Sequence, residues 1–421
     1  MVGGLGTEAL SGAAICNQLI FIYNISVNGL LAGSSIFTAQ FYGKNDEEGI
    51  RNTFRYKLIF AGGLAFFTCL ILLTAKEYLI GLFLAGSGQQ DAIELAKLFA
   101  RQYLSIMAAG LIPYGISQAF AGTLRETDEV NLPMAASLIA VGVNILLSFC
   151  LIYGMMGLPR LGIAGAAVAN VIARFLECSI LFFWTWRKRE IYRFIHGGLR
   201  LWEVSGQLFW PILKKGIPNF VNAFVWSAGV TLMFQSFSTR GLSAVVAYNI
   251  ASTVNGVFAN VFGGLSVTLM IMVGQQLGAG RIHQARDITK KLLAFAVVIC
   301  IFIGSIMAAG ARYIPELYNM SGEVKALVIK VILIMASILP CCGFTNCAGN
   351  TFRAGGMTLL GFALEGIFTM IVVVPCAYIL SRFTQLSFLA LYIVCQYTEV
   401  IKAMIQLSFI RKGNWARNVV G

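Results

Sequence analysis

The sequence is poor in charged residues, and this shortage limits the classes of protein to which it can belong. Only 12% of its residues are charged, about half the share typical of a soluble domain, whereas 58% are hydrophobic and the mean hydropathy is +0.79. This balance excludes a soluble globular protein and indicates an integral membrane protein. A net charge of +13 would suggest nucleic acid in a soluble chain. In a membrane protein, Lys and Arg gather in cytoplasmic loops, so we expect no nucleic-acid partner.

The sequence also lacks the motifs of most enzymes and metal proteins. Its ten cysteines form no C-x-x-C pattern, and its two histidines, His196 and His283, lie in basic loops. There is no zinc-site spacing and no nucleophile elbow. The glycine-rich stretch 162–170 follows no strand, so it favours close helix packing over phosphate binding. We therefore expect no enzymatic activity, no cofactor and no metal site.

Long apolar runs dominate what remains. A membrane helix needs about 20 residues to cross about 30 Å of hydrocarbon. Eleven segments meet this requirement: 9–40, 53–75, 98–122, 131–154, 163–186, 212–238, 244–275, 288–311, 326–349, 357–380 and 387–410. The sequence therefore predicts an all-α polytopic membrane protein.

The distribution of basic residues predicts the orientation. Most of them fall on one side if the loop after Tyr42 is cytoplasmic, and this side then includes Lys44, Arg51, Arg55, Lys57, Arg125, Arg353 and the basic tail. We expect a multi-pass protein of the cell membrane with a cytoplasmic C-terminus. The charged stretch 187–211 divides the chain into lobes 1–186 and 212–421, and its aromatic residues Trp202, Phe209 and Trp210 suggest a helix lying at the membrane interface.

The two lobes resemble each other in sequence. At an offset of 235 residues, the first lobe matches the second at Gln40 and Gln275, Gly43 and Gly278, and Arg51 and Arg286. At an offset of 228, Gln118 matches Asn346 and Arg125 matches Arg353. Two pseudo-symmetric six-helix lobes are a common transporter plan. A complete helix precedes Gly241, whereas only five residues precede its match Gly6, so we expect most of a further helix to be encoded upstream of Met1.

Several short motifs carry a family resemblance. They include "MVGGLGTEALSGAA", "AQFYGKNDEEGIRN", "AGTLRETDEVNLP", "GIAGAAVANVIARFLE", "KKGIPNFVNAFV" and "NTFRAGGM", in this order. With this series, the chain resembles the bacterial MATE family of multidrug and toxic-compound extrusion transporters. The resemblance implies two six-helix lobes, a central cavity and rocker-switch alternating access. It also implies a monomer that exports cationic or amphiphilic small molecules across the bilayer in exchange for H⁺ or Na⁺.

The chain departs from the family pattern at the acids that couple transport to cations. The family's usual aspartate of the first helix would lie upstream of Met1. In the fifth helix, the family has Asn followed four positions later by Asp or Asn, and this chain has Asn144 and Ser148. These two residues remain candidates for cation coupling, but the family's acids cannot be carried over intact.

Charges within the apolar segments are functional candidates because charge is costly in a bilayer. Arg174 and Glu177, and likewise Glu399 and Lys402, are spaced i, i+3 and can form ion pairs on one helix face. Glu365 has no basic residue at i±3 or i±4 and should lie about 12 Å along its helix. An unpaired, buried carboxylate disfavours its charged form, which suits reversible protonation, so Glu365 is the leading coupling candidate. A partner on another helix remains the alternative.

Uncharged polar residues in the apolar segments are candidates for the cavity lining, with interhelical hydrogen bonding as the alternative. They are Gln18, Asn24, Asn28, Ser117, Gln118, Asn222, Gln235, Asn255, Thr345 and Asn346. Two other functions stay open: a lipid-linked saccharide flippase of the same superfamily, and a non-transporting remnant. A flippase should have a more basic cavity, and only Arg174 and Lys402 supply basic charge away from the ends of the segments.

Overall fold

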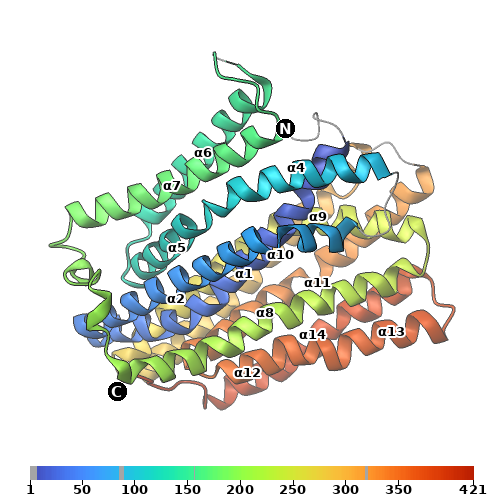
Figure 1. The fold of residues 1–421 in the computed structure, drawn as a ribbon. Helices are drawn as coiled ribbons and strands as arrows, with labels where there is room; N and C mark the ends of the chain where they lie inside the picture. The colour runs from blue at the N-terminus through green and yellow to red at the C-terminus, as the bar shows by residue number, and fades with distance from the viewer. Residues whose placement is uncertain (1–6, 85–89, 156, 318–320) are drawn as a thin grey trace. The chain divides into compact units, whose positions relative to one another are not determined.

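The computed structural model describes residues 7–84, 90–155, 157–317 and 321–421, which form helices joined by turns and loops and contain no strand. The chain forms two compact units, of which the first comprises 1–38 and 46–213 and the second 39–45 and 214–421. Each unit is an assembly of long helices joined by short connections (Figure 1). The prediction of an all-α polytopic fold is confirmed.

The first unit contains seven α-helices and a linker of short turns. Its helices are α1 (Thr7–Lys44, whose last residues belong to the second unit), α2 (Glu47–Thr74), α3 (Lys76–Leu84), α4 (Gln90–Ala108), α5 (Leu111–Glu126), α6 (Asn131–Tyr153) and α7 (Ile163–Arg187). Local chemistry sets several ends. Asp46 caps α2 by accepting from the Gly49 N–H at 2.8 Å, and Gly154 ends α6 with a φ of 73°, which glycine adopts easily.

The second unit is built from the remaining helices. They are α8 (Phe209–Ser238, whose first residues belong to the first unit), α9 (Leu242–Gly278), α10 (Ile282–Gly310), α11 (Gly322–Ala354), α12 (Thr358–Phe362), α13 (Val374–Phe383) and α14 (Phe388–Lys412). Two π-helical segments, η6 (Ala363–Ile367) and η7 (Thr369–Val373), join α12 to α13 into one span. Ser387 caps the start of α14, and basic residues with Gly413 end it.

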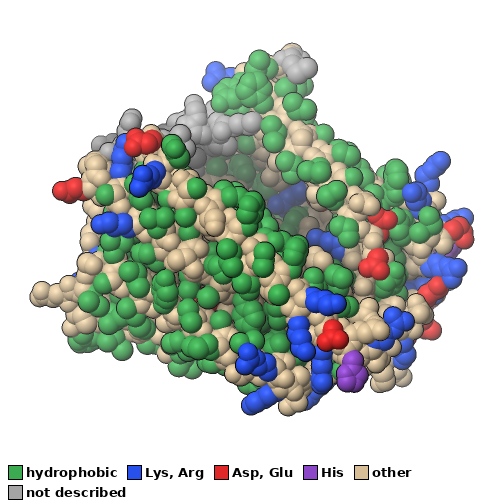
Figure 2. Space-filling model, turned by 180° about the vertical axis from the view of Figure 1, so that it is seen from behind, with side chains coloured by type: hydrophobic (Ala, Val, Ile, Leu, Met, Phe, Trp, Pro, Cys, Tyr) green, Lys and Arg blue, Asp and Glu red, His purple; other side chains and the backbone are tan. Residues whose placement is uncertain are grey.

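Ten helices of the described chain are long and apolar enough to cross a membrane, or eleven if a bent pair counts as one span. The bent pair is α4 with α5, which meet at 45° around Ala109 and Gly110 where the sequence predicts one helix over 98–122. Large apolar side chains such as Phe66, Leu138 and Phe183 are 61–67% exposed, and hydrophobic side chains cover much of the visible face in Figure 2. Such surfaces are suited to lipid.

The linker is not the interfacial helix that its aromatic residues suggest. It consists of three short 3₁₀ turns, Arg193–Ile195, Leu201–Glu203 and Gly206–Leu208, while Phe209 and Trp210 already begin α8. Two glycines, Gly197 and Gly198, interrupt the stretch, and Arg55 of α2 donates hydrogen bonds to the carbonyls of Gly197 and Glu203. These hydrogen bonds from α2 take the place of the backbone hydrogen bonds of a continuous helix. Trp202 is nonetheless 81% exposed.

Repeat-matched residues meet inside the second unit, where the end of α1 packs against the end of α9. A Cβ at Gly43 would overlap the Gln275 carbonyl, and a Cβ at Gly278 would overlap the Gln40 carbonyl. The Gln40 amide donates to the Ala354 carbonyl at 2.8 Å and accepts from the Val419 N–H at 2.7 Å. The matched glycines therefore permit a reciprocal close approach that no other residue allows.

Candidate functional site

Glu365 of the second unit is held by an ion pair and an amide. One carboxylate oxygen, Oε2, pairs with the Arg353 guanidinium from the end of α11 and accepts from Asn222 Nδ2 of α8 at 2.8 Å. The other oxygen, Oε1, lies where a side chain on Gly349 would stand, and Gly366 leaves room for the Asn222 amide. The expectation that Glu365 has no ionic partner is wrong, and the alternative of a partner on another helix is confirmed, because Arg353 lies twelve residues earlier in the chain, on α11.

The backbone around this acid is π-helical, with Glu365 inside η6. Thr369 begins η7 and donates its hydroxyl to the Glu365 carbonyl at 2.7 Å. A wider π turn shifts the direction of the following side chains, and such turns are frequent at functional sites. The side chains of Arg353 and Glu365 are 16% and 17% exposed, so solvent or a ligand can reach this ion pair.

A second cluster of charged residues in this unit lies along α14. Lys402 donates to Glu399 Oε1 at 2.6 Å, as the i, i+3 spacing predicts, and Thr345 of α11 donates to Glu399 Oε2 at 3.1 Å. One turn beyond Lys402, Gln406 is fully buried, and neither its amide oxygen nor its amide nitrogen has a partner. A buried, unsatisfied amide is costly, so this face of α14 carries unused hydrogen-bonding capacity.

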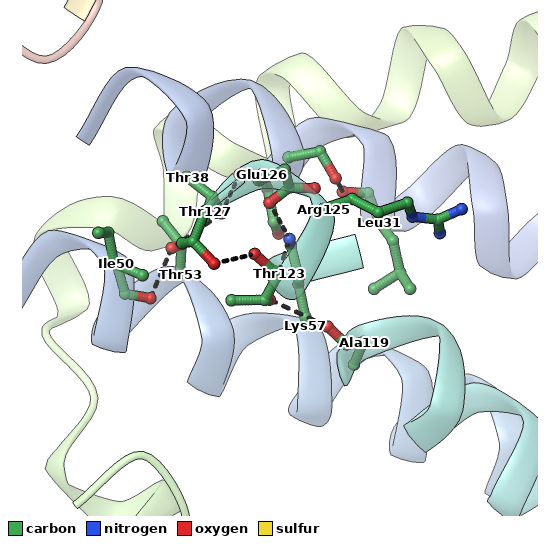
Figure 3. A network of polar contacts seen from close by, with 12 residues as sticks. Leu31, Thr38, Ile50, Thr53, Lys57, Ala119, Thr123, Arg125, Glu126 and Thr127 are labelled. Atoms are coloured by element: carbon green, nitrogen blue, oxygen red, sulfur yellow. Dashed lines mark hydrogen bonds and ion pairs between the residues drawn. The ribbon is translucent and has the colours of Figure 1, made fainter. Parts of the chain in front are cut away.

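The first unit contains a buried ion pair that the sequence reasoning missed (Figure 3). Lys57 of α2 pairs with Glu126 of α5, and their side chains are 1% and 3% exposed. Lys57 also donates to Thr123 at 3.2 Å, and Thr38 donates to Thr53 at 3.0 Å beside it. The orientation argument counts Lys57 only among the cytoplasmic basic residues, whereas it lies ten residues into α2 and is buried. Only the tertiary fold brings together residues 69 positions apart.

The predicted pair on α7 does not form, although both residues are described. Glu177 accepts instead from Ser137 of α6 at 2.6 Å. Arg174 lies over the Tyr114 ring, with its guanidinium carbon 4.8 Å from the ring centroid, and donates to the Gly110 carbonyl at 3.3 Å. The Gly110 carbonyl lies at the bend between α4 and α5. The Arg174 guanidinium therefore contacts a neutral acceptor and an aromatic ring instead of the Glu177 carboxylate.

The other predicted residues are distributed between the two units. Ser148 donates to Asn144 within one turn of α6 at 3.2 Å. Ser117 is buried and bonds to the Pro113 carbonyl, and Asn346 is exposed and bonds to the Cys342 carbonyl. Gln18, Asn28 and Gln235 are exposed, and Asn24, Gln118 and Asn255 are half-buried. Among all the predicted residues, the structure also brings together Glu365 with Asn222, and Glu399 with Lys402 and Thr345.

Long helices with apolar surfaces and a few embedded ion pairs define a multi-pass membrane protein of the all-α class. The chain belongs to the MATE family of multidrug and toxic-compound extrusion transporters, because the MatE family model matches residues 1–150 and 219–379. The prediction of the family is confirmed.

Relatives and solved structures agree with this assignment. The chain is 23% identical to a multidrug resistance protein NorM of Thermotoga maritima, with 100% of this chain and 88% of the relative covered. It is 23% identical to a multidrug resistance protein YoeA of Bacillus subtilis, with 92% and 82% covered. A MATE family transporter solved in an outward-facing conformation matches 98% of this chain and 89% of its own, with a TM-score of 0.86 and 21% identity. These relatives are transporters, in line with the expectation that the chain is not an enzyme.

Proposed function

We propose that the protein is a secondary antiporter that exports cationic or amphiphilic small molecules in exchange for H⁺ or Na⁺ by alternating access. Family membership supports the transport class, and the names of the relatives support multidrug cargo. In this proposal the protein works as a monomer in the cell membrane, with its C-terminus in the cytoplasm. Neither a cofactor nor a bound metal is required.

The observation that carries the proposal is the carboxylate of Glu365. It lies within the span Thr358–Phe383, is partly exposed, and already shares one oxygen between a guanidinium and an amide. Exchange requires that two occupants of a site weaken each other's binding. A proton or Na⁺ at Glu365 would release Arg353, and a cationic cargo would compete for the same carboxylate. The arrangement therefore supports a site with alternative cationic occupants.

Three other residues extend this proposal. Asn222 is placed to orient the carboxylate of Glu365, since its amide bonds to Oε2 at 2.8 Å. Asn144 and Ser148 are proposed as a second coupling position in the first unit, because they occupy the family's polar positions on that helix and bond to each other. The remaining polar residues are proposed to line the path of the cargo.

Ethidium accumulation tests the proposal in cells. Cells that express the protein should accumulate less ethidium than cells without it, and collapse of both the H⁺ and the Na⁺ gradients should abolish the difference. Efflux that survives gradient collapse but follows the ATP level would contradict the antiporter class. Equal accumulation in both cell lines, with the protein present in the membrane, would contradict export of this cation.

A further inference from the structure

A cavity of about 190 Å³ lies in the linker of the first unit, where α7 ends. Its wall combines apolar side chains with two arginines and a histidine, and consists of Trp186, Arg189, Ile195, His196, Gly197, Leu199 and Arg200. None of these lining residues is acidic. A concave surface lined by charges of one sign concentrates ligands of the opposite sign, so this cavity favours an anion.

The wall of the cavity is held in place by neighbouring helices. Arg55 of α2 donates to the Gly197 carbonyl at 2.9 Å, which ties the turn of the linker to the first unit. Trp186, in the last turn of α7, stacks on Phe182 with ring centroids 6.0 Å apart and an interplanar angle of 18°. The cavity therefore exists before a ligand arrives, and binding requires little ordering of the chain.

The basic side chains of the wall have hydrogen-bonding capacity to spare. Arg189 and His196 both approach the carboxylate of Glu190, at 4.0 and 3.8 Å, which is beyond hydrogen-bonding distance. Glu190 is 86% exposed, so it competes weakly with a ligand. Arg200 donates to Glu203 at 3.3 Å, and that carboxylate is shared with α2. Most of the N–H donors on the two guanidinium groups therefore remain available.

The backbone of the wall adds further donors. Gly197 has a φ of 73°, a left-handed conformation that glycine adopts easily. The N–H groups of Gly197 and Leu199 donate to no described residue of the chain. Guanidinium groups that bind oxygen pairs, together with free backbone N–H groups, are the donors that recognise phosphate in proteins.

The surroundings of the cavity favour a lipid over a free ion as the source of the phosphate. Near the end of α7, Phe183 and Trp184 are 67% and 46% exposed, and Ile191 beyond the helix is 68% exposed. Exposed aromatic rings beside basic residues at the end of a membrane helix mark the level of the lipid headgroups. A lipid with its phosphate in the cavity can lay its acyl chains on this apolar surface, whereas a free phosphate gains nothing from it.

We propose that the cavity binds the phosphate of an anionic membrane lipid, with Arg189 and Arg200 as the guanidinium ligands and Trp186 as the apolar wall. A zwitterionic phosphatidylcholine fits less well, because it brings a quaternary ammonium to a basic cavity. The site is separate from the proposed coupling residue Glu365, which belongs to the second unit. It requires that α7 ends at the membrane surface and does not depend on which cargo is transported.

Native mass spectrometry of the full-length protein in neutral detergent tests the site. The first lipid bound should be phosphatidylglycerol, about tenfold more tightly than phosphatidylcholine with the same acyl chains. Arg200→Gln should weaken phosphatidylglycerol binding about fivefold. Arg193→Gln is the matched control, because Arg193 lies in the same linker at 66% exposure, against 62% for Arg200, but pairs with Glu47 and does not line the cavity. It should change the affinity less than about twofold.

Inorganic phosphate separates the two sources of the anion. Phosphatidylglycerol should raise the unfolding temperature of the wild type more than that of Arg200→Gln, whereas excess inorganic phosphate should leave both temperatures and lipid binding unchanged. Displacement of the lipid by inorganic phosphate would overturn the lipid assignment. Equal affinity for the two lipids, or equal effects of Arg200→Gln and Arg193→Gln, would overturn the site itself. If Arg200→Gln does not fold, Arg189→Gln decides the matter by the same measurements.

Discussion

The two units differ in how completely each one buries an ion pair. In the first, Lys57 and Glu126 are 1% and 3% exposed, Lys57 also donates to Thr123, and Thr38 donates to Thr53 beside the pair. In the second, Arg353 and Glu365 are 16% and 17% exposed, and Asn222 shares the carboxylate while keeping a buried oxygen without a partner. A sealed pair has no route by which an ion or cargo can enter, whereas a partly open pair with spare polar capacity has one. We therefore interpret the first pair as structural and the second as functional.

The largest expected effect comes from breaking the sealed pair. Lys57→Met leaves Glu126 buried without its cation and should lower the free energy of unfolding by about 3–5 kcal/mol, measured as loss of folded protein in detergent during heating. Glu77→Gln is the matched control, because Glu77 pairs with Arg101 at the surface of the same unit and should change stability by less than about 1 kcal/mol.

A second substitution sharpens the structural interpretation of this pair. Replacing both partners, as Lys57→Met with Glu126→Leu, removes both charges and should recover much of the lost stability. If Lys57→Met folds as stably as the wild type, the sealed pair contributes nothing and the contrast between the units fails.

An intermediate effect is expected at the pair on α14, whose side chains are 10% (Lys402) and 23% (Glu399) exposed, much less sealed than Lys57 and Glu126. Glu399→Gln leaves Lys402 without its carboxylate but keeps an acceptor for Thr345. Partial exposure relieves the stranded charge, so we expect a loss of roughly 1–2 kcal/mol in the same heating experiment. A loss as large as that of Lys57→Met would show that exposure does not separate the pairs.

The smallest expected effect concerns Gln406, whose buried amide has no partner. Gln406→Met has a similar shape and no amide to desolvate, so stability should be unchanged or raised by about 1 kcal/mol if the amide serves only packing. Efflux of ethidium by the variant is measured at equal expression. Lower stability with lower efflux would show instead that the amide holds a ligand or water in the working protein.

Helix number and fold were predictable from the sequence because apolar runs of membrane length dominate it. The bend at Gly110 was not predicted, although Gly110 and Pro113 are helix-breaking residues, because the length of the run 98–122 fits a single span. The π-helical turns around Glu365 also left no sequence signal, since they depend on how Asn222 and Gly366 fit together across helices.

Some ion pairs follow from helical spacing and could be predicted from the sequence, whereas others depend on the tertiary fold. The spacing of Glu399 and Lys402 predicted their ion pair because both lie on one helix face without a stronger competitor. The same spacing failed for Arg174 and Glu177, because the Tyr114 ring, the Gly110 carbonyl and Ser137 offer each side chain another partner. Pairs that join different helices, such as Lys57 with Glu126, require the fold itself.

The most direct test of the account uses Glu365→Gln in proteoliposomes without ATP. An imposed pH or Na⁺ gradient should drive ethidium transport by the wild type, whereas the variant, which keeps the shape of the side chain and one acceptor oxygen but carries no charge, should show no gradient-driven transport. Its loss of stability should be no larger than that of Glu399→Gln and well below that of Lys57→Met, so that it still folds. Transport by Glu365→Gln at the wild-type rate, at equal reconstitution and under both gradients, would contradict the central claim that the partly open pair couples cation to cargo.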